Sequence, residues 1–206
     1  MAADAKQETK PDVPTSKLIE SFKSCRRVST PIVAIETPDA AATIATLMKV
    51  LPTETPILSW DCVRGLKGLN NPGQAAFDGL QIDQQVTVNV TESLLAAERL
   101  PTLSVLFLHN AHLQILENGH AKAEVVQAIW NLRNPFKSTR RLLVLLGPVF
   151  QLPPELSSDV FVLDEPLPTR QDLSGVIDRQ HKNAKMELPN DETRDAVNRN
   201  AIDQAG

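Results

Sequence analysis

The chain has 206 residues, of which 42% are hydrophobic and 22% are charged, and its net charge is −4. These values are ordinary for a globular protein of one domain with tails. The negative charge, with no stripe of basic and aromatic residues, argues against a protein whose main task is to bind nucleic acid. No apolar run is long enough to span a membrane, and no basic amphipathic helix indicates a membrane surface.

Cys25 and Cys62 are the only cysteines of the chain. Two cysteines give no disulfide framework, which favours a reducing compartment. Residues 1–16 are polar and lack the apolar segment of a signal peptide. We therefore expect a cytoplasmic protein with a disordered leader over residues 1–16.

Apolar periodicity predicts strands and helices that alternate along the chain. Residues 62–82 hold four of the eight glycines and are predicted as loop, and 86–90 is predicted as an edge strand or loop. The alternation predicts a three-layer α/β fold with a parallel sheet between helices. The predicted strands are 31–36, 56–61, 103–108, 142–146 and 160–163, and the predicted helices are 17–25, 38–51, 91–100, 121–134, 170–183 and 191–201.

The turn after the first predicted strand is where a nucleotide-binding α/β domain carries its phosphate loop. Such a loop needs several glycines, whose N–H groups wrap the phosphates, and then a lysine and a serine or threonine. Here the strand is followed by Thr37, as helix cap, then Pro38 and Asp39, with no glycine or lysine. Pro38 lacks an N–H group, and Asp39 opposes an anion by its own charge. The sequence predicts a nucleotide-hydrolase fold without its phosphate-binding loop, with weak nucleotide binding as the alternative.

Six segments, in this order and spacing, are similar to one known family. They include Trp60-Asp61-x-x-x-Gly65-Leu66 and Leu152-Pro153-x-Glu155-Leu156. The chain resembles the N-terminal, P-loop-less RecA-like domain of a group of AAA+ ATPases. This group includes the FtsH-like AAA proteins of chloroplast genomes and cyanobacteria, and bacterial and phage relatives. The resemblance covers roughly residues 17–180, and its segments are 26–37, 59–66, 106–112, 142–148, 152–156 and 166–168.

The resemblance implies a RecA-like (P-loop NTPase-like) sheet with strand order 5-1-4-3-2, the predicted strands being numbered along the chain. It implies a degenerate domain over 17–184, followed by a helical linker over 185–206 toward an AAA module. In the family, that module carries the intact Walker motifs. ATP and Mg²⁺ are therefore expected only there, and no cofactor or metal is expected in this chain. The implied partners are an AAA+ module in cis or in trans, further copies of the chain and protein substrates.

The resemblance also places a degenerate nucleotide pocket. The family has an acidic residue where this chain has Asn110, and it shares His112. An amide cannot hold Mg²⁺ or its water as a carboxylate does. Thr37, Pro38, Asp39, Asn110 and His112 are accordingly the positions of a pocket that has lost its catalytic groups.

A second candidate site lies where the second and third predicted strands end side by side. Trp60, Asp61, Cys62 and His109 are a possible interaction site there. Cys62 is a candidate nucleophile, His109 or His112 its base, and Asp61 the residue that orients the histidine. The alternative is an inert cysteine, with Trp60 packed in the core and Asp61 capping a turn. His109 and His112, with Glu117 and His120 nearby, lack a matched metal-ligand spacing.

Three functions follow from these observations. The first is a non-catalytic accessory domain of an AAA+ ATPase, which serves assembly, regulation or substrate engagement. The second is a stand-alone protein–protein adaptor on the same fold, and the third is a small Cys/His hydrolase. Arginine pairs precede the first and fourth predicted strands, and they are interpreted as solvated charges, with an arginine-finger contact to a neighbouring subunit as the alternative.

Overall fold

The computed structural model describes residues 17–165 and the single residue Ala196. The chain divides into two units, 1–165 and 166–206, and the account below concerns the first. The predicted leader over 1–16, the two predicted helices after residue 166 and the linker over 185–206 lie outside the described residues. No helix in the described part is both long and apolar enough to cross a bilayer.

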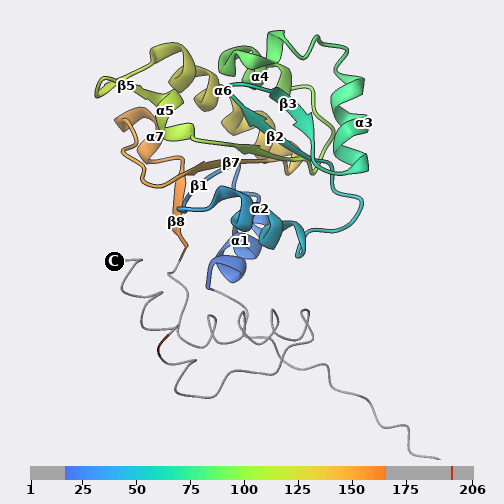
Figure 1. Cartoon of the computed structure of the whole chain (residues 1–206), viewed down its shortest axis with the longest axis horizontal. Coiled ribbons are helices and arrows are strands. Elements are labelled where there is room, and N and C mark those ends of the chain that lie inside the picture. Colours follow the sequence, from blue (N-terminus) through green and yellow to red (C-terminus); the bar gives the residue numbers. More distant parts are fainter. Residues whose placement is uncertain (1–16, 166–195, 197–206) are drawn as a thin grey trace, which may run out of the picture. The chain divides into compact units, whose positions relative to one another are not determined.

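A six-stranded sheet forms the centre of the first unit, in the order β3-β2-β4-β7-β1-β8 (Figure 1). Its strands are parallel except β3, which runs antiparallel to β2. The five predicted strands correspond to β1, β2, β4, β7 and β8, so the predicted order 5-1-4-3-2 is confirmed, with β3 added beyond β2. The strands are β1 (Ile32–Glu36), β2 (Ile57–Asp61), β3 (Gly65–Gly68), β4 (Val105–Leu108), β7 (Leu142–Gly147) and β8 (Phe161–Asp164).

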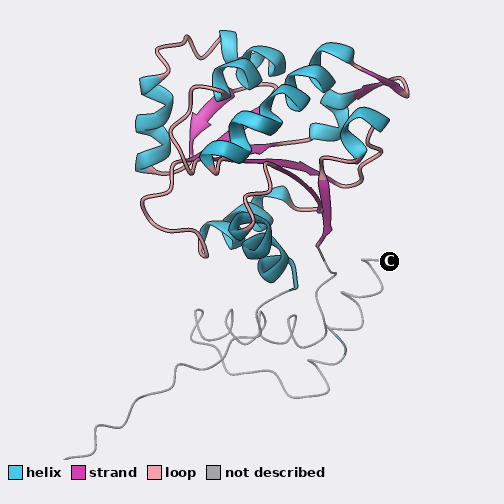
Figure 2. Ribbon diagram, turned by 180° about the vertical axis from the view of Figure 1, so that it is seen from behind, coloured by secondary structure: helices cyan, strands magenta, loops and turns pink. Residues whose placement is uncertain are grey.

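Helices cover both faces of this sheet, as the three-layer prediction requires (Figures 1 and 2). Helices α1 (Lys17–Arg27) and α2 (Ala40–Met48) pack on one face, where alternate strand residues such as Val33 and Phe107 form one core. The remaining helices pack on the other face around Trp60 and Leu106. These are α3 (Asn71–Gly79), α4 (Val90–Ala97), α5 (Ala111–Ile115), α6 (Ala123–Thr139) and α7 (Pro154–Ser157).

The segment predicted as loop over 62–82 contains both β3 and α3, so that prediction was wrong. Two of its glycines serve close packing rather than chain flexibility. A Cβ at Gly73 would overlap the carbonyl of Ile57, and one at Gly68 would overlap the backbone of Gln74. The Asn70 side chain caps α3 by accepting a hydrogen bond from Gly73 N at 2.8 Å. The glycine content alone favours a loop, because the sequence does not show the close contacts that require these glycines.

The alternation over 86–90 is not an edge strand either. Residues Val86–Val88 form a 3₁₀ turn, η1, and Asn89 caps α4 through its side chain. The buried residue Thr87 joins this turn to the sheet. Its carbonyl accepts from Trp60 Nε1 at 2.6 Å, and its Oγ1 accepts from Leu66 N at 2.9 Å. A small hairpin of β5 (Leu116–Glu117) and β6 (His120–Ala121), which was not predicted, follows α5.

Candidate functional site at the carboxyl edge of the sheet

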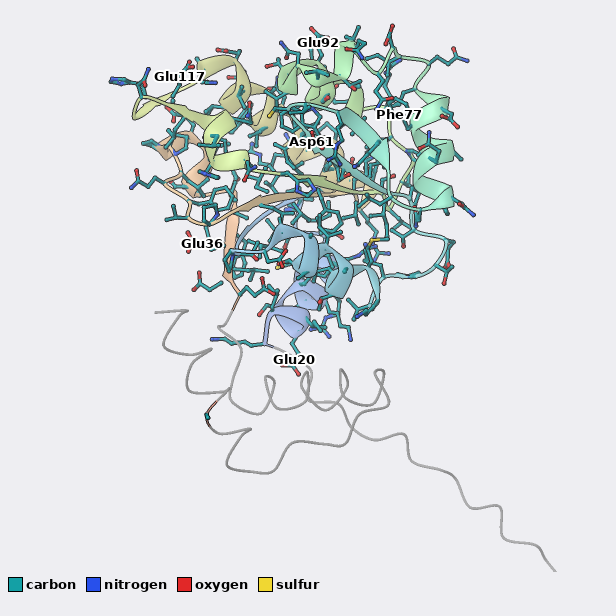
Figure 3. The ribbon with its side chains drawn as sticks, viewed as in Figure 1. Glu20, Glu36, Asp61, Phe77, Glu92 and Glu117 are labelled. Carbon is teal, nitrogen blue, oxygen red and sulfur yellow. The ribbon has the colours of Figure 1, made fainter. Side chains whose placement is uncertain are left out.

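The carboxyl ends of the parallel strands share one edge of the sheet, where open α/β proteins bind their ligands. Both groups of candidate residues lie there, but β7 and β4 separate β1 from β2. With about 4.8 Å between neighbouring strands, the ends of β1 and β2 are about 14 Å apart, and each group also takes residues that follow β4. Figure 3 labels one carboxylate from each group, Glu36 at the end of β1 and Asp61 at the end of β2. The structure therefore contains two separate candidate sites.

The turn after β1 uses most of its N–H groups internally. Thr37 N donates to the Gly147 carbonyl at 2.9 Å, Asp39 N donates to Thr37 Oγ1 at 3.1 Å, and Pro38 has no N–H group. Ala42 N donates to Asp39 Oδ1 at 3.0 Å. Within the described chain, only Ala40 and Ala41 in this turn keep N–H groups without an acceptor. A phosphate loop needs the opposite arrangement, a series of N–H groups open toward the ligand.

The cap of α2 is Asp39, not Thr37 as predicted. Thr37 is 3% exposed, and its hydroxyl lies 2.8 Å from Thr43 Oγ1, one turn into the helix. The helix starts later than expected because the Asp39 carboxylate takes the N–H group of Ala42. This carboxylate stands at the helix end where a bound phosphate would stand.

A chain of polar groups extends from this turn to the end of β8. Thr43 Oγ1 lies 2.6 Å from Glu165 Oε2. The Thr43 hydroxyl donates to this carboxylate, with the Asp39 carbonyl as a second acceptor at 2.9 Å, and because its one hydrogen is used in this way it accepts from Thr37. Glu36 Oε1 accepts from Phe150 N at 2.7 Å. Three carboxylates, those of Glu36, Asp39 and Glu165, thus surround the turn, and they repel an incoming phosphate.

Asn110 and His112 follow β4. Asn110 is exposed, has a φ of 50° and makes no side-chain cap to α5. His112 is half-buried and packs edge-on against Phe150, with ring centroids 6.4 Å apart. A Cβ at Gly147 would stand 2.6 Å from His112 Nδ1, so a glycine is required at that strand end. Thr37 and His112 therefore meet around Gly147, whereas Asn110 is directed to solvent.

The second group lies where β2 and β4 end. Trp60 is 1% exposed and belongs to the core, where its indole N–H is bonded to Thr87. Asp61 caps the next turn, since its Oδ1 accepts from Val63 N at 3.0 Å and from Arg64 N at 2.8 Å. Burial by itself would raise the pKa of Asp61. The two N–H donors and the nearby cations outweigh it, and the pKa is lowered.

His109 is held beside Asp61 because the backbone N–H of His109 donates to the Trp60 carbonyl at 3.0 Å. Burial lowers the pKa of His109, the charges of Lys67 and Arg64 lower it further, and the Asp61 charge opposes the shift. Cys62 is exposed, and no hydrogen bond joins it to His109 within the described residues. The structure thus brings Asp61 and His109 together but does not assemble the nucleophile and base pair. Residues 17–165 also contain no group of three His, Cys, Asp or Glu side chains placed to hold a metal.

Sequence reasoning missed Thr43, Gly147, Phe150 and Glu165, which complete the first group. Thr43 is one turn inside a helix of small residues, and no local pattern distinguishes it. Glu165 is 122 residues away along the chain from its partner. Gly147 gave a signal, because a glycine directly after a buried strand often marks a close approach.

These features define an α/β domain of the RecA-like type found in AAA+ ATPases. Two solved structures show the same fold: a Walker-type ATPase of Pyrococcus abyssi (TM-score 0.55, 11% identity, 94% of this chain and 65% of that chain covered) and a DNA replication initiation factor (TM-score 0.51, 13% identity, 88% and 54% covered). This chain thus spans less than two thirds of either protein, and at these identities the likeness shows the fold alone. A search of curated protein sequences finds no match.

The particular family follows from the sequence match. The model of the SpoVK-like AAA ATPase N-terminal domain matches residues 18–165. The chain belongs to this family. The matched range ends at Glu165, directly after β8 closes the sheet.

Proposed function

We propose that residues 17–165 are a non-catalytic accessory domain of an AAA+ ATPase. The domain serves assembly, regulation or substrate engagement for an ATP-hydrolysing module in cis or in trans. The observation that carries this proposal is the hydrogen bond from Ala42 N to the Asp39 carboxylate, because it places a negative charge where a nucleotide phosphate would bind. ATP and Mg²⁺ then belong to the catalytic module, and a relation to the FtsH-like AAA proteins is part of the proposal.

A second observation supports contact with a protein partner. Trp130 on α6 is 39% exposed and borders a groove of about 320 Å³, next to the aliphatic side chain of Val126. Arg133 stacks over the indole at 4.7 Å and is fixed there by Asp159, at 2.7 Å. Rigid tryptophan and arginine side chains are typical of the central residues of protein interfaces. This groove also supports the second candidate, the stand-alone adaptor.

The first experiment determines the length of the native polypeptide in its source cells with an antibody to this domain. A polypeptide much larger than 22.6 kDa that carries Walker motifs supports the accessory role in cis. Deletion of residues 17–165 from it should leave ATP turnover measurable but reduce assembly or substrate processing. ATP hydrolysis by the 206-residue chain alone, abolished by Asn110→Ala, would contradict the proposal.

A further inference from the structure

A basic hollow lies at the opposite, amino edge of the sheet. It has a volume of about 250 Å³ and lies where the chain enters three neighbouring strands, β1, β7 and β4. Four of its five lining residues are cations. The lining residues, which define the basic hollow, are Lys23, Arg26, Arg27, Leu103 and Arg140.

The described part of the chain does not neutralise these four cations. Within residues 17–165, no ion pair or side-chain hydrogen bond involves any of them, although Arg133 and Lys122 elsewhere pair with carboxylates. Glu20 is on the same helix as Lys23 but points away from the sheet (Figure 3). The Nη1 atom of Arg26 is buried and has no acceptor among residues 17–165. A buried guanidinium nitrogen without an acceptor is costly.

The charges of the hollow also oppose one another. Burial lowers the pKa of the Arg26 guanidinium, and the charge of Arg140 lowers it further. Folding therefore brings like charges together without a compensating group in the described chain. Lys23, Arg27 and Arg140 are exposed, so solvent screens part of this repulsion, and a bound anion would relieve the rest.

The backbone around the hollow adds a second, independent observation. Leu103 has a φ of 67°, and Arg140, which ends α6, has a φ of 55°. Glycine or asparagine is the usual residue in this left-handed conformation, which is costly for a side chain such as leucine. Leu103 N is bonded to the Thr139 carbonyl at 3.1 Å, which holds the two segments together. Unfavourable backbone of this kind gathers at ligand-binding positions.

We infer that the basic hollow binds a small phosphoryl anion, such as pyrophosphate or the terminal phosphates of a small phosphorylated molecule. Four positive charges match a multiply charged phosphate group better than a single carboxylate. Arginine forks bind phosphate oxygens in pairs, and three of the four cations that line the hollow are arginines. The hollow lies on the edge of the sheet away from the β1–α2 turn, so this inference does not depend on the proposed accessory function.

The test is a calorimetric titration of the full 206-residue chain with pyrophosphate. Arg26→Gln removes the half-buried guanidinium, and Arg140→Asn removes a charge while suiting the left-handed backbone. The matched control is Lys122→Gln, at the other end of α6. This helix has 17 residues, which places the control about 25 Å from Arg140. We expect one binding site, weakened about tenfold or more in both test variants and unchanged in the control.

Thermal denaturation with and without pyrophosphate distinguishes anion binding by Arg26 and Arg140 from a purely structural role of these two residues. Without pyrophosphate, Arg26→Gln and Arg140→Asn should melt at or above the temperature of the unchanged chain, because they relieve repulsion. With pyrophosphate, only the unchanged chain and the Lys122→Gln control should gain stability. The inference is overturned if pyrophosphate does not bind, if the control loses as much affinity as the test variants, or if only an oligonucleotide or an acidic peptide binds.

Discussion

The Thr43 hydroxyl donates a hydrogen bond of 2.6 Å to the Glu165 carboxylate, which connects the first turn of α2 to the end of β8. We expect Thr43→Val to lower the free energy of unfolding by about 1–3 kcal/mol, because the buried Thr37 hydroxyl also loses its partner. Urea denaturation measures this change. Thr53→Val is the matched control, since Thr53 is exposed and should change stability by less than about 0.5 kcal/mol. Equal stability of the two variants would show that the polar chain does not contribute.

Asp39→Ala separates the capping role of this carboxylate from nucleotide binding. Loss of the cap should cost about 1 kcal/mol of stability, measured in the same denaturation experiment. When combined with Arg26→Gln, which disables the basic hollow, the variant should show no thermal shift with Mg-ATP, because Pro38 lacks an N–H donor and no lysine is nearby. A clear ATP-dependent shift in the Arg26→Gln chain would show that the turn binds nucleotide despite its carboxylates.

The two tryptophans form a matched pair. Trp60→Phe removes the hydrogen bond to the Thr87 carbonyl and leaves that buried acceptor with one donor fewer. We expect a loss of about 1–3 kcal/mol in the free energy of unfolding. Trp130→Phe changes a side chain that is 39% exposed and should cost less than about 1 kcal/mol. If Trp130→Phe proves the more destabilising, the core described around Trp60 is wrong.

Acidification should destabilise the domain through His109. Burial lowers the pKa of this histidine in the folded state from 6.5, while Asp61 opposes the shift. The unfolded chain then binds the proton first, so stability falls as the pH drops through 6.5 and levels off below the folded pKa. Asp61→Asn removes the opposing charge and should lower the folded pKa of His109 further. NMR titration of the His109 imidazole in both chains measures these pKa values. A pKa of His109 that is higher in the folded chain than in the unfolded chain would contradict the predicted loss of stability on acidification.

The strands were predictable because they are continuous apolar runs, such as Leu142–Gly147, all of whose residues are buried, whereas their order came from the family resemblance. Short elements escaped prediction because their stability comes from distant partners. The turn at Val86–Val88 alternates like a strand, but it is fixed by bonds from Trp60 and Leu66 to Thr87. The hydrogen bond between Thr43 and Glu165 forms because β1 and β8 are neighbours in the sheet. No local sequence pattern predicts this long-range contact. The sequence after β1 lacks the glycines and the lysine that a phosphate loop requires, and the loss of that loop stays a prediction.

Differential labelling of the two cysteines tests the hydrolase alternative. Cys62 is exposed, whereas Cys25 is buried and burial raises the pKa of its thiol. A thiol-reactive probe at neutral pH should therefore label Cys62 at the rate of a simple thiol, and Cys25 only after unfolding. His109→Gln should leave the Cys62 rate unchanged, because no hydrogen bond joins the two side chains in the described structure. Labelling much faster than a simple thiol, and slowed by His109→Gln, would instead support a nucleophile activated by that histidine.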